Sequence, residues 1–165
     1  LIGNKQVNSW ALTLIFFSLK INSLFLCINC CSINRLAEII DYIEIAPNAK
    51  LIEEGNSIDF LYILVEGEVT VTVHVPSIGL VETCTFGPLD IIGWSAMTPV
   101  VRQRMGTVTA STYCRLLRFD SKQFTQLCEN DHDIGFFIYR RISNMAARSF
   151  LTTQLRLMNL LAEQL

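Results

Sequence analysis

The middle of the chain alternates apolar and polar residues with the period of two that is typical of β-strands. In VTVTVHV, residues 69–75, valine occupies every second position, so this strand is expected to bury one face. Similar short runs follow one another between turn residues: AKLIEE, DFLYILVE, LVETCTF, GTVTAST and YCRLLRF. Their connections are too short for βαβ crossovers, which predicts a β-sandwich or barrel with strands that begin after Pro47. A tight hairpin turn is predicted at Glu66-Gly67, because glycine readily adopts a positive φ.

Helical spacing flanks this β-region on both sides. The stretch SINRLAEIID, residues 32–41, has a serine cap and apolar residues on one face, which predicts a short amphipathic helix. An aspartate cap opens a second short helix over DSKQFTQLCEN, residues 120–130. From Asp133 to the end runs a long helical pattern without proline and without glycine after Gly135.

The distal part of this long helix is apolar over a greater length than one small β-domain covers. The residues that recur there at spacings of three and four are Phe150, Leu151, Leu155, Met158, Leu161 and Leu165. We expect this part to pack against another copy of the chain, as a homodimer, or against another element. Folding back onto its own barrel is the alternative.

The N-terminal segment is strongly apolar between residues 9 and 33. Lys20, Asn22 and Asn29 interrupt it, so no uninterrupted run reaches the roughly 18 residues that span a bilayer. It also lacks the basic start and small-residue cleavage site of a signal peptide. A buried helix that packs on the domain or on a second subunit is favoured over a membrane span. The first residue is leucine, which is consistent with a longer natural chain.

Composition narrows the class of protein. The 165 residues, 51% of them hydrophobic, are enough for one compact domain with a sizeable core. Thirteen basic against 15 acidic residues, a net charge of −2, provide no broad cationic field for nucleic acid or an anionic membrane. Six cysteines are scattered through a chain with a full core, which indicates reduced thiols and a cytoplasmic location.

Metal binding and catalysis find little support in the sequence. Cys27, Cys30 and Cys31 have the spacing of a metal motif, but no second cysteine pair accompanies them. Neither His74 nor His132 falls at ligand spacing, and both are interpreted as solvated surface residues. No Ser/His/Asp, Cys/His or paired-carboxylate arrangement is present, so neither a metal site nor an enzyme is expected.

Several segments together resemble the cyclic nucleotide-binding domain of catabolite-activator-type bacterial regulators and of the regulatory subunits of eukaryotic kinases. The matching residues are Ile52 and Gly55, LYILVEGEVTV with Gly67, FGPLDIIG with Gly87, Asp90 and Gly93, RMGTVTA from Arg104, and LLRFDSKQF. The resemblance covers residues 24–165 and leaves residues 1–23 as an atypical apolar segment. It implies a mainly β fold, an eight-stranded jelly-roll (double-stranded β-helix) with flanking helices and a long C-terminal helix. Residues 86–110, FGPLDIIGWSAMTPVVRQRMGTVTA, would then be the phosphate-binding cassette.

The cassette has a physical basis for anion binding. A cyclic phosphodiester carries one negative charge, so its site needs a fixed cation and backbone N–H donors. Gly93 allows close backbone approach, and Ser95, Ala96 and Met97 would open a short helix with N-terminal amides directed at the anion.

The cation is assigned from the resemblance. Arg104 stands directly before a Met-Gly-Thr-Val strand, where the family places its phosphate-binding arginine. Arg102 would take its place after a one-turn shift of the loop. A structural ion pair of Arg104 with Asp90 or Glu82 is an equal alternative.

The departure from the family pattern is Trp94. Members that bind cyclic nucleotides have a glutamate at this position, which accepts a hydrogen bond from the ribose 2′-hydroxyl, whereas tryptophan only donates. Losing this bond costs about 1 kcal/mol or more. Met105 also adds bulk beside the phosphate position. The Gly-Trp-Ser sequence resembles a variant of some bacterial members, so ordinary cyclic AMP binding is not assumed.

Two functions remain open. The first is a regulatory domain in which cyclic AMP, cyclic GMP or a related small anion binds at Gly93–Met97 and Arg104 and repositions the C-terminal helix. The second is a ligand-free structural or dimerisation module whose pocket is filled by Trp94 and Met105; for Trp94, packing is the favoured role. The sequence up to Leu165 contains no helix-turn-helix after the long helix, so no DNA-binding element is expected.

Overall fold

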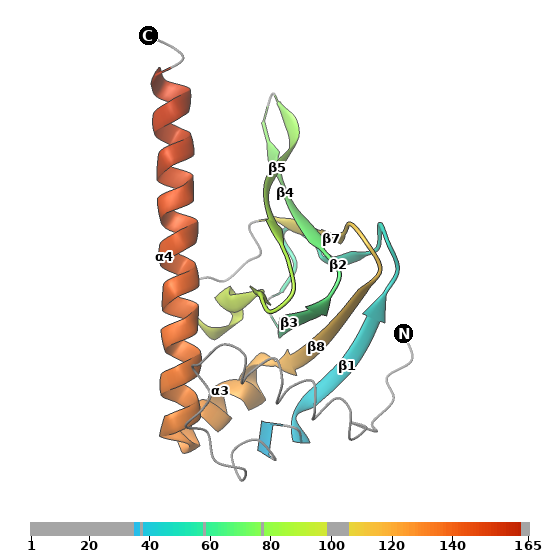
Figure 1. Cartoon of the computed structure of the whole chain (residues 1–165), viewed down its shortest axis with the longest axis vertical. Helices are drawn as coiled ribbons and strands as arrows, with labels where there is room; N and C mark the ends of the chain where they lie inside the picture. The colour runs from blue at the N-terminus through green and yellow to red at the C-terminus, as the bar shows by residue number, and fades with distance from the viewer. Residues whose placement is uncertain (1–34, 37, 58, 77, 99–105, 163–165) are drawn as a thin grey trace.

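The computed structural model describes residues 35–162 except 37, 58, 77 and 99–105, and Figure 1 shows its arrangement. In this part of the chain eight strands form two four-stranded antiparallel sheets, in the orders β1-β8-β3-β6 and β2-β7-β4-β5. The strands are β1 Ile40–Ile45, β2 Lys50–Ile52, β3 Phe60–Glu66, β4 Val69–Val75, β5 Gly79–Phe86, β6 Ile91–Ile92, β7 Thr107–Ala110 and β8 Cys114–Asp120. A long helix follows them, so the predicted class, a mainly β jelly-roll with a C-terminal helix, is confirmed.

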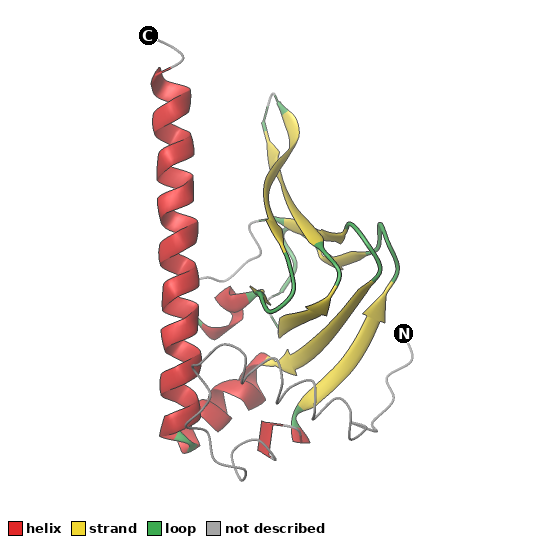
Figure 2. Ribbon diagram, in the orientation of Figure 1, coloured by secondary structure: helices red, strands yellow, loops and turns green. Residues whose placement is uncertain are grey.

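The helices gather on one side of the strands, as Figure 2 shows. The short helix α3, Ser121–Asn130, begins at the predicted cap, where Asp120 Oδ1 accepts from the backbone N–H groups of Lys122 and Gln123, each at 3.0 Å. The 31-residue helix α4, His132–Ala162, confirms the predicted long helix. No helix in the described part of the chain is long and apolar enough to cross a membrane.

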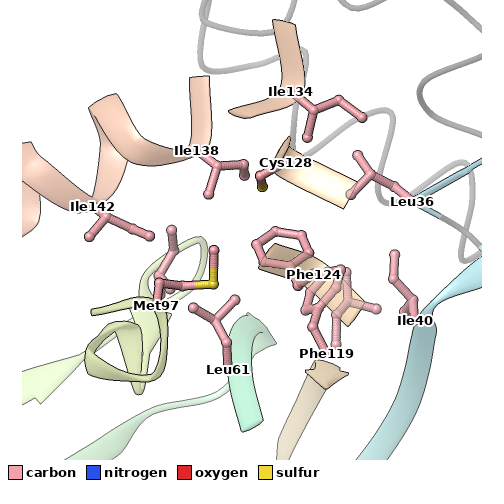
Figure 3. Packing of buried hydrophobic residues seen from close by; sticks show 12 residues of the cluster. Leu36, Ile40, Leu61, Met97, Phe119, Phe124, Cys128, Ile134, Ile138 and Ile142 are labelled. Atoms are coloured by element: carbon pink, nitrogen blue, oxygen red, sulfur yellow. The ribbon is translucent and has the colours of Figure 1, made fainter. Parts of the chain in front are cut away.

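Two apolar clusters hold these layers together. Side chains alternate across a strand, so Leu116 of β8 lies in the cluster between the sheets and Leu117 lies in the cluster under the helices. Figure 3 shows the second cluster, in which Phe124 of α3 packs on Phe119 of β8 with ring centroids 4.7 Å apart. The outer face of one sheet is thereby joined to α3 and α4.

The structure corrects the start of the domain. The helix predicted over residues 32–41 ends early, because Ile40 already begins β1 and pairs with Phe119 of β8. The sequence analysis placed the first strand after Pro47, but β1 lies before this proline, so one strand was missed. The spacing of Leu36, Ile39 and Ile40 is helical, but the two isoleucines are β-branched residues common in strands, and pairing with β8 decides in favour of a strand.

The hairpin predicted at Glu66-Gly67 was also wrong in its pairing. A tight turn is present, but β3 and β4 belong to different sheets, so this turn carries the chain from one sheet to the other. Gly67 has a φ of 98°, and a Cβ there would lie 2.5 Å from the carbonyl oxygen of Tyr113. Glycine meets both demands of this corner.

The hairpin of β4 and β5 extends beyond the rest of the jelly-roll (Figure 1). Beyond Thr72, β4 pairs only with β5, because β7 ends its pairing there. The predicted one-sided burial of residues 69–75 is complete only at Val69, and Val71, Val73 and Val75 are half-buried. At the tip, Ile78 and Leu80 are 75% and 73% exposed.

Candidate functional site

The segment predicted as a cassette begins with a loop that is tied to β3. Within the loop, Asp90 Oδ2 accepts from the backbone N–H of Gly87 at 2.9 Å. The N–H of Leu89 donates to the carbonyl oxygen of Leu64 at 2.7 Å, and the N–H of Leu64 donates to the carbonyl oxygen of Asp90 at 3.1 Å. The entry to β6 is therefore held at a defined position by backbone bonds to the sheet.

A short 3₁₀ turn, η1, Trp94–Met97, follows β6 directly, as the cassette prediction expects. Gly93 precedes it in the left-handed conformation, with φ 74° and ψ 24°. The N–H of Ala96 donates to the carbonyl oxygen of Gly93 at 2.9 Å, and the N–H of Thr98 donates to that of Ser95 at 3.1 Å. The first N–H groups of a helical turn have no partner within the turn, and here these are the N–H groups of Trp94 and Ser95.

Two side chains of this turn, those of Trp94 and Met97, pack toward the helices. Met97 is buried in the cluster under α3 and α4, where Figure 3 shows it between Leu61 and Ile142. Thr125 of α3 donates to Met97 Sδ at 3.5 Å. Trp94 is half-buried and packs against the same cluster. The packing role favoured for Trp94 thus agrees with its position, and the cassette turn shares one core with α4.

Two arginines of α4 bond to the chain around the cassette, and the sequence analysis singled out neither. Arg141 Nη2 donates to the carbonyl oxygen of Leu89, and Arg156 Nη1 donates to that of Thr83 on β5. Burial lowers the pKa of the Arg141 guanidinium, an effect that the Asp90 carboxylate opposes. Arg141 lies three residues after the buried Ile138, which brings its side chain to the side of α4 that faces the domain.

Two predicted site residues, Arg104 and Met105, lie outside the described residues, and so does Arg102, the alternative to Arg104. The carboxylates considered as partners of Arg104 have other contacts. Asp90 accepts from Gly87, and Glu82 Oε1 accepts from the hydroxyl of Thr85 at 3.3 Å.

The structure describes three of the six cysteines and both histidines. Cys27, Cys30 and Cys31 lie outside the described residues, and Cys84, Cys114 and Cys128 are free thiols. Burial raises the pKa of Cys128 to about 12, which disfavours the reactive thiolate. His74 and His132 are exposed, and within residues 35–162, as far as they are described, no three His, Cys, Asp or Glu side chains form a potential metal site.

Comparison with solved structures identifies the fold. A cyclic nucleotide-binding domain from Methylobacillus flagellatus superposes with a TM-score of 0.78 at 20% identity, covering 96% of this chain and 86% of that chain. The c-di-GMP-responsive global regulator CLP of Xanthomonas campestris gives 0.71 at 16% identity, covering 80% and 64%. The regulatory subunit of a cAMP-independent protein kinase A from Trypanosoma brucei gives 0.67 at 17% identity, covering 87% and 51%.

Sequence comparison gives the family. A comparison with curated protein sequences found no match. The family model of the cyclic nucleotide-binding domain, however, matches residues 42–131, which is more than half of the chain and includes β3 to β8 and the turn after Gly93. The resemblance inferred from the sequence is confirmed, and the chain belongs to the cyclic nucleotide-binding domain family.

Proposed function

We propose that this chain is a regulatory domain that binds a cyclic nucleotide or a related small anion at the Gly93 turn and transmits binding to α4. One observation carries the proposal: Met97 and Trp94 of the turn lie in the same apolar cluster as Ile138 and Ile142 of α4. Packed interiors resist deformation, so a shift of the turn requires a shift of the helix.

The binding step uses charge and backbone donors. The phosphate accepts hydrogen bonds from the N–H groups of Trp94 and Ser95, and Arg104 supplies the cation. Closure of the cassette on the anion then moves Met97 against Ile142. The helix α4 carries this displacement away from the jelly-roll.

The identity of the anion is a separate question. Trp94 offers no acceptor for a ribose hydroxyl, so this site loses one hydrogen bond that cyclic AMP makes in typical members. The structural relatives differ in this respect, since one is c-di-GMP-responsive, one is cAMP-independent and two are solved with cAMP. The proposal therefore does not assume cyclic AMP.

A dimer is the second part of the proposal. The exposed apolar residues of α4 include Phe150, Leu151, Leu155, Leu157 and Met158, with Phe150 62% and Met158 65% exposed. These residues lie on other sides of α4 than Ile138 and Ile142, which pack on the domain. A second copy of α4 would cover them, so the helix would carry the signal between two subunits. The cytoplasmic location stays a prediction from the cysteine content.

The alternative is a structural module that has lost its ligand. The packing of Trp94 on the outer cluster favours it, because a large aromatic then has a structural role without a ligand. In this version the domain contributes its fold and its dimer interface only.

Calorimetry separates the two. The purified chain is titrated with cyclic AMP, cyclic GMP and cyclic di-GMP, and the titrations are repeated with Arg104→Ala and with Arg102→Ala as the matched control. We expect saturable binding of at least one nucleotide that only Arg104→Ala abolishes. Absence of binding for all three would favour the structural module.

A further inference from the structure

A leucine occupies a turn position that glycine or asparagine normally fills. The turn over residues 87–90 closes where the N–H of Asp90 donates to the carbonyl oxygen of Gly87 at 3.1 Å. Pro88 stands at its second position and Leu89 at its third, where a type II turn requires a positive φ. Leu89 has a φ of 74°, a conformation that an L-residue with a side chain disfavours by about tenfold. The turn before β6 is therefore strained at Leu89.

The other positive φ angles of the described residues belong to residue types that accept them. These residues are Asn48, Gly55, Gly67, Gly79 and Gly93. A bulky side chain with a positive φ is uncommon, and it persists only where the surrounding contacts hold it. Among the described residues, Leu89 is thus the one whose backbone conformation depends on its partners.

Two elements hold the backbone of Leu89. Strand β3 holds its N–H, which donates to the carbonyl oxygen of Leu64 at 2.7 Å. Helix α4 holds its carbonyl oxygen, which accepts from Arg141 Nη2. The contact with β3 is made within the jelly-roll, whereas the contact with Arg141 depends on the position of α4. A movement of α4 away from the turn therefore removes the second of these two restraints.

Loss of the Arg141 bond has a consequence for the cassette. The carbonyl oxygen of Leu89 would lose a charged donor, and the strain at Leu89 would then favour a return to a negative φ. Strand β6, Ile91–Ile92, is only two residues long and lies between Leu89 and Gly93. A change in the turn therefore reaches the Gly93 turn through a very short segment.

We infer that Leu89 is a strained switch that Arg141 locks, so that movement of α4 releases the entry to β6 and the Gly93 turn. The inference rests on the proposed function for its role in signalling, and it names the element that relays a change between the Gly93 turn and α4. The coupling is reciprocal, because a ligand that shifts the turn weakens the Arg141 bond and a partner that holds α4 in place favours the locked turn. The strain limits this coupling to about tenfold.

The test measures the lock without a ligand. Amide hydrogen exchange of residues 85–93 is followed by mass spectrometry in the wild-type chain, Leu89→Gly and Leu89→Ala, each with and without Arg141→Met. Both substitutions at residue 89 remove the half-buried leucine side chain, but only glycine removes the strain. Exchange in β8 is the reference for global opening, and urea unfolding shows that each variant is folded. Arg140→Met, at an exposed arginine of the same helix, is the matched control.

We expect Arg141→Met to accelerate exchange of residues 85–93 about tenfold relative to β8 when residue 89 is leucine or alanine, because both residues keep the strain. With Leu89→Gly the acceleration should be less than about threefold, because glycine keeps a positive φ without the lock. Leu89→Gly should also have an unfolding equilibrium constant about fivefold lower than that of Leu89→Ala. Arg140→Met should leave the exchange unchanged.

Two results would overturn the inference. Unchanged exchange in Arg141→Met would show that Arg141 does not lock the turn. An acceleration in the Leu89→Gly background as large as in the wild-type background would show that strain at Leu89 plays no part. Both measurements are made without nucleotide, so they leave the proposed function in place, and that function fails separately if calorimetry detects no nucleotide binding.

Discussion

Arg141 of α4 donates a hydrogen bond to the carbonyl oxygen of Leu89, 52 residues earlier in the chain. Leu89 has a φ of 74°, and its own N–H donates to Leu64 of β3 at 2.7 Å. Leu89 thus connects the long helix, the first loop of the cassette and the sheet. Apolar packing also joins α4 to the cassette turn, and the hydrogen bond adds a contact with a fixed direction.

Replacing Arg141 with methionine should lower the free energy of unfolding by about 1–3 kcal/mol, because a hydrogen bond from a charged donor is lost in a half-buried position. Urea unfolding monitored by circular dichroism measures the change. Arg140→Met is the control, since Arg140 is exposed and should change stability by less than about 0.5 kcal/mol. Equal effects of the two substitutions would show that the bond to Leu89 contributes nothing.

Gly67→Ala should be among the most destabilising single changes in the domain. The alanine would need a positive φ, at about 1–2 kcal/mol, and its Cβ would clash with the backbone at Tyr113. Gly55→Ala separates the two effects, because Gly55 has a φ of 83° and open space around the missing Cβ. Urea unfolding should show Gly67→Ala as the less stable variant by at least about 1 kcal/mol. Similar free energies of unfolding for the two variants would show that the Cβ of Gly67→Ala does not clash.

Alkaline pH should lower the stability of the fold, because Tyr42 of β1 ionises there. Burial raises the pKa of Tyr42 from 10.0 to about 12, and its hydrogen bond to Glu44 Oε1, 2.8 Å long, acts in the same direction. A raised pKa in the folded state stabilises the fold fully below the unfolded value and is lost as the pH rises through the folded one. Stability should therefore fall between about pH 10 and pH 12.

Phenolate absorbance during an alkaline titration measures this directly. Tyr42→Phe should remove a group that titrates near pH 12 and should flatten the fall in stability. Tyr113→Phe, which removes the other tyrosine bonded to Glu44, should leave that group in place. A titration curve that Tyr42→Phe leaves unchanged would contradict the assignment.

The exposed face of α4 should form a dimer. We expect the chain without nucleotide to elute as a dimer in size-exclusion chromatography with light scattering. The double variant Leu151→Glu/Met158→Glu should elute as a monomer, because two charges per helix would enter an apolar interface. Thr152→Glu adds a charge on the polar face of the same helix and should leave the dimer intact. A monomeric wild-type chain at tens of micromolar would refute the interface.

Sequence periodicity predicted most of the elements correctly. The runs at residues 69–75 and 114–120 are strands, and the cap at Asp120 begins α3 as expected. The errors fall where two local structures suit the same residues. Ile40 has helical spacing from Leu36 but a β-branched side chain that suits a strand, and Gly67 fits a hairpin or a corner between sheets. In both places, pairing with a distant strand decides the outcome.

The candidate site was predicted in part. Gly93 and the short turn after it were expected from the residues, and the turn is present. Arg141 and Arg156 were missed because their acceptors lie 52 and 73 residues away in the chain. The local sequence around a helical arginine does not show whether its side chain bonds to a distant carbonyl oxygen or is only solvated.

The sequence by itself determined the family, the positions of most strands, the long helix and the turn after Gly93, because these depend on interactions between residues close together in the chain. Only the tertiary structure decided which sheet each strand joins, that Trp94 packs toward the helices, and which face of α4 meets β5. Those choices depend on contacts between segments that folding brings together over many residues. In this domain, local patterns placed the elements, and long-range packing joined the cassette to the helix.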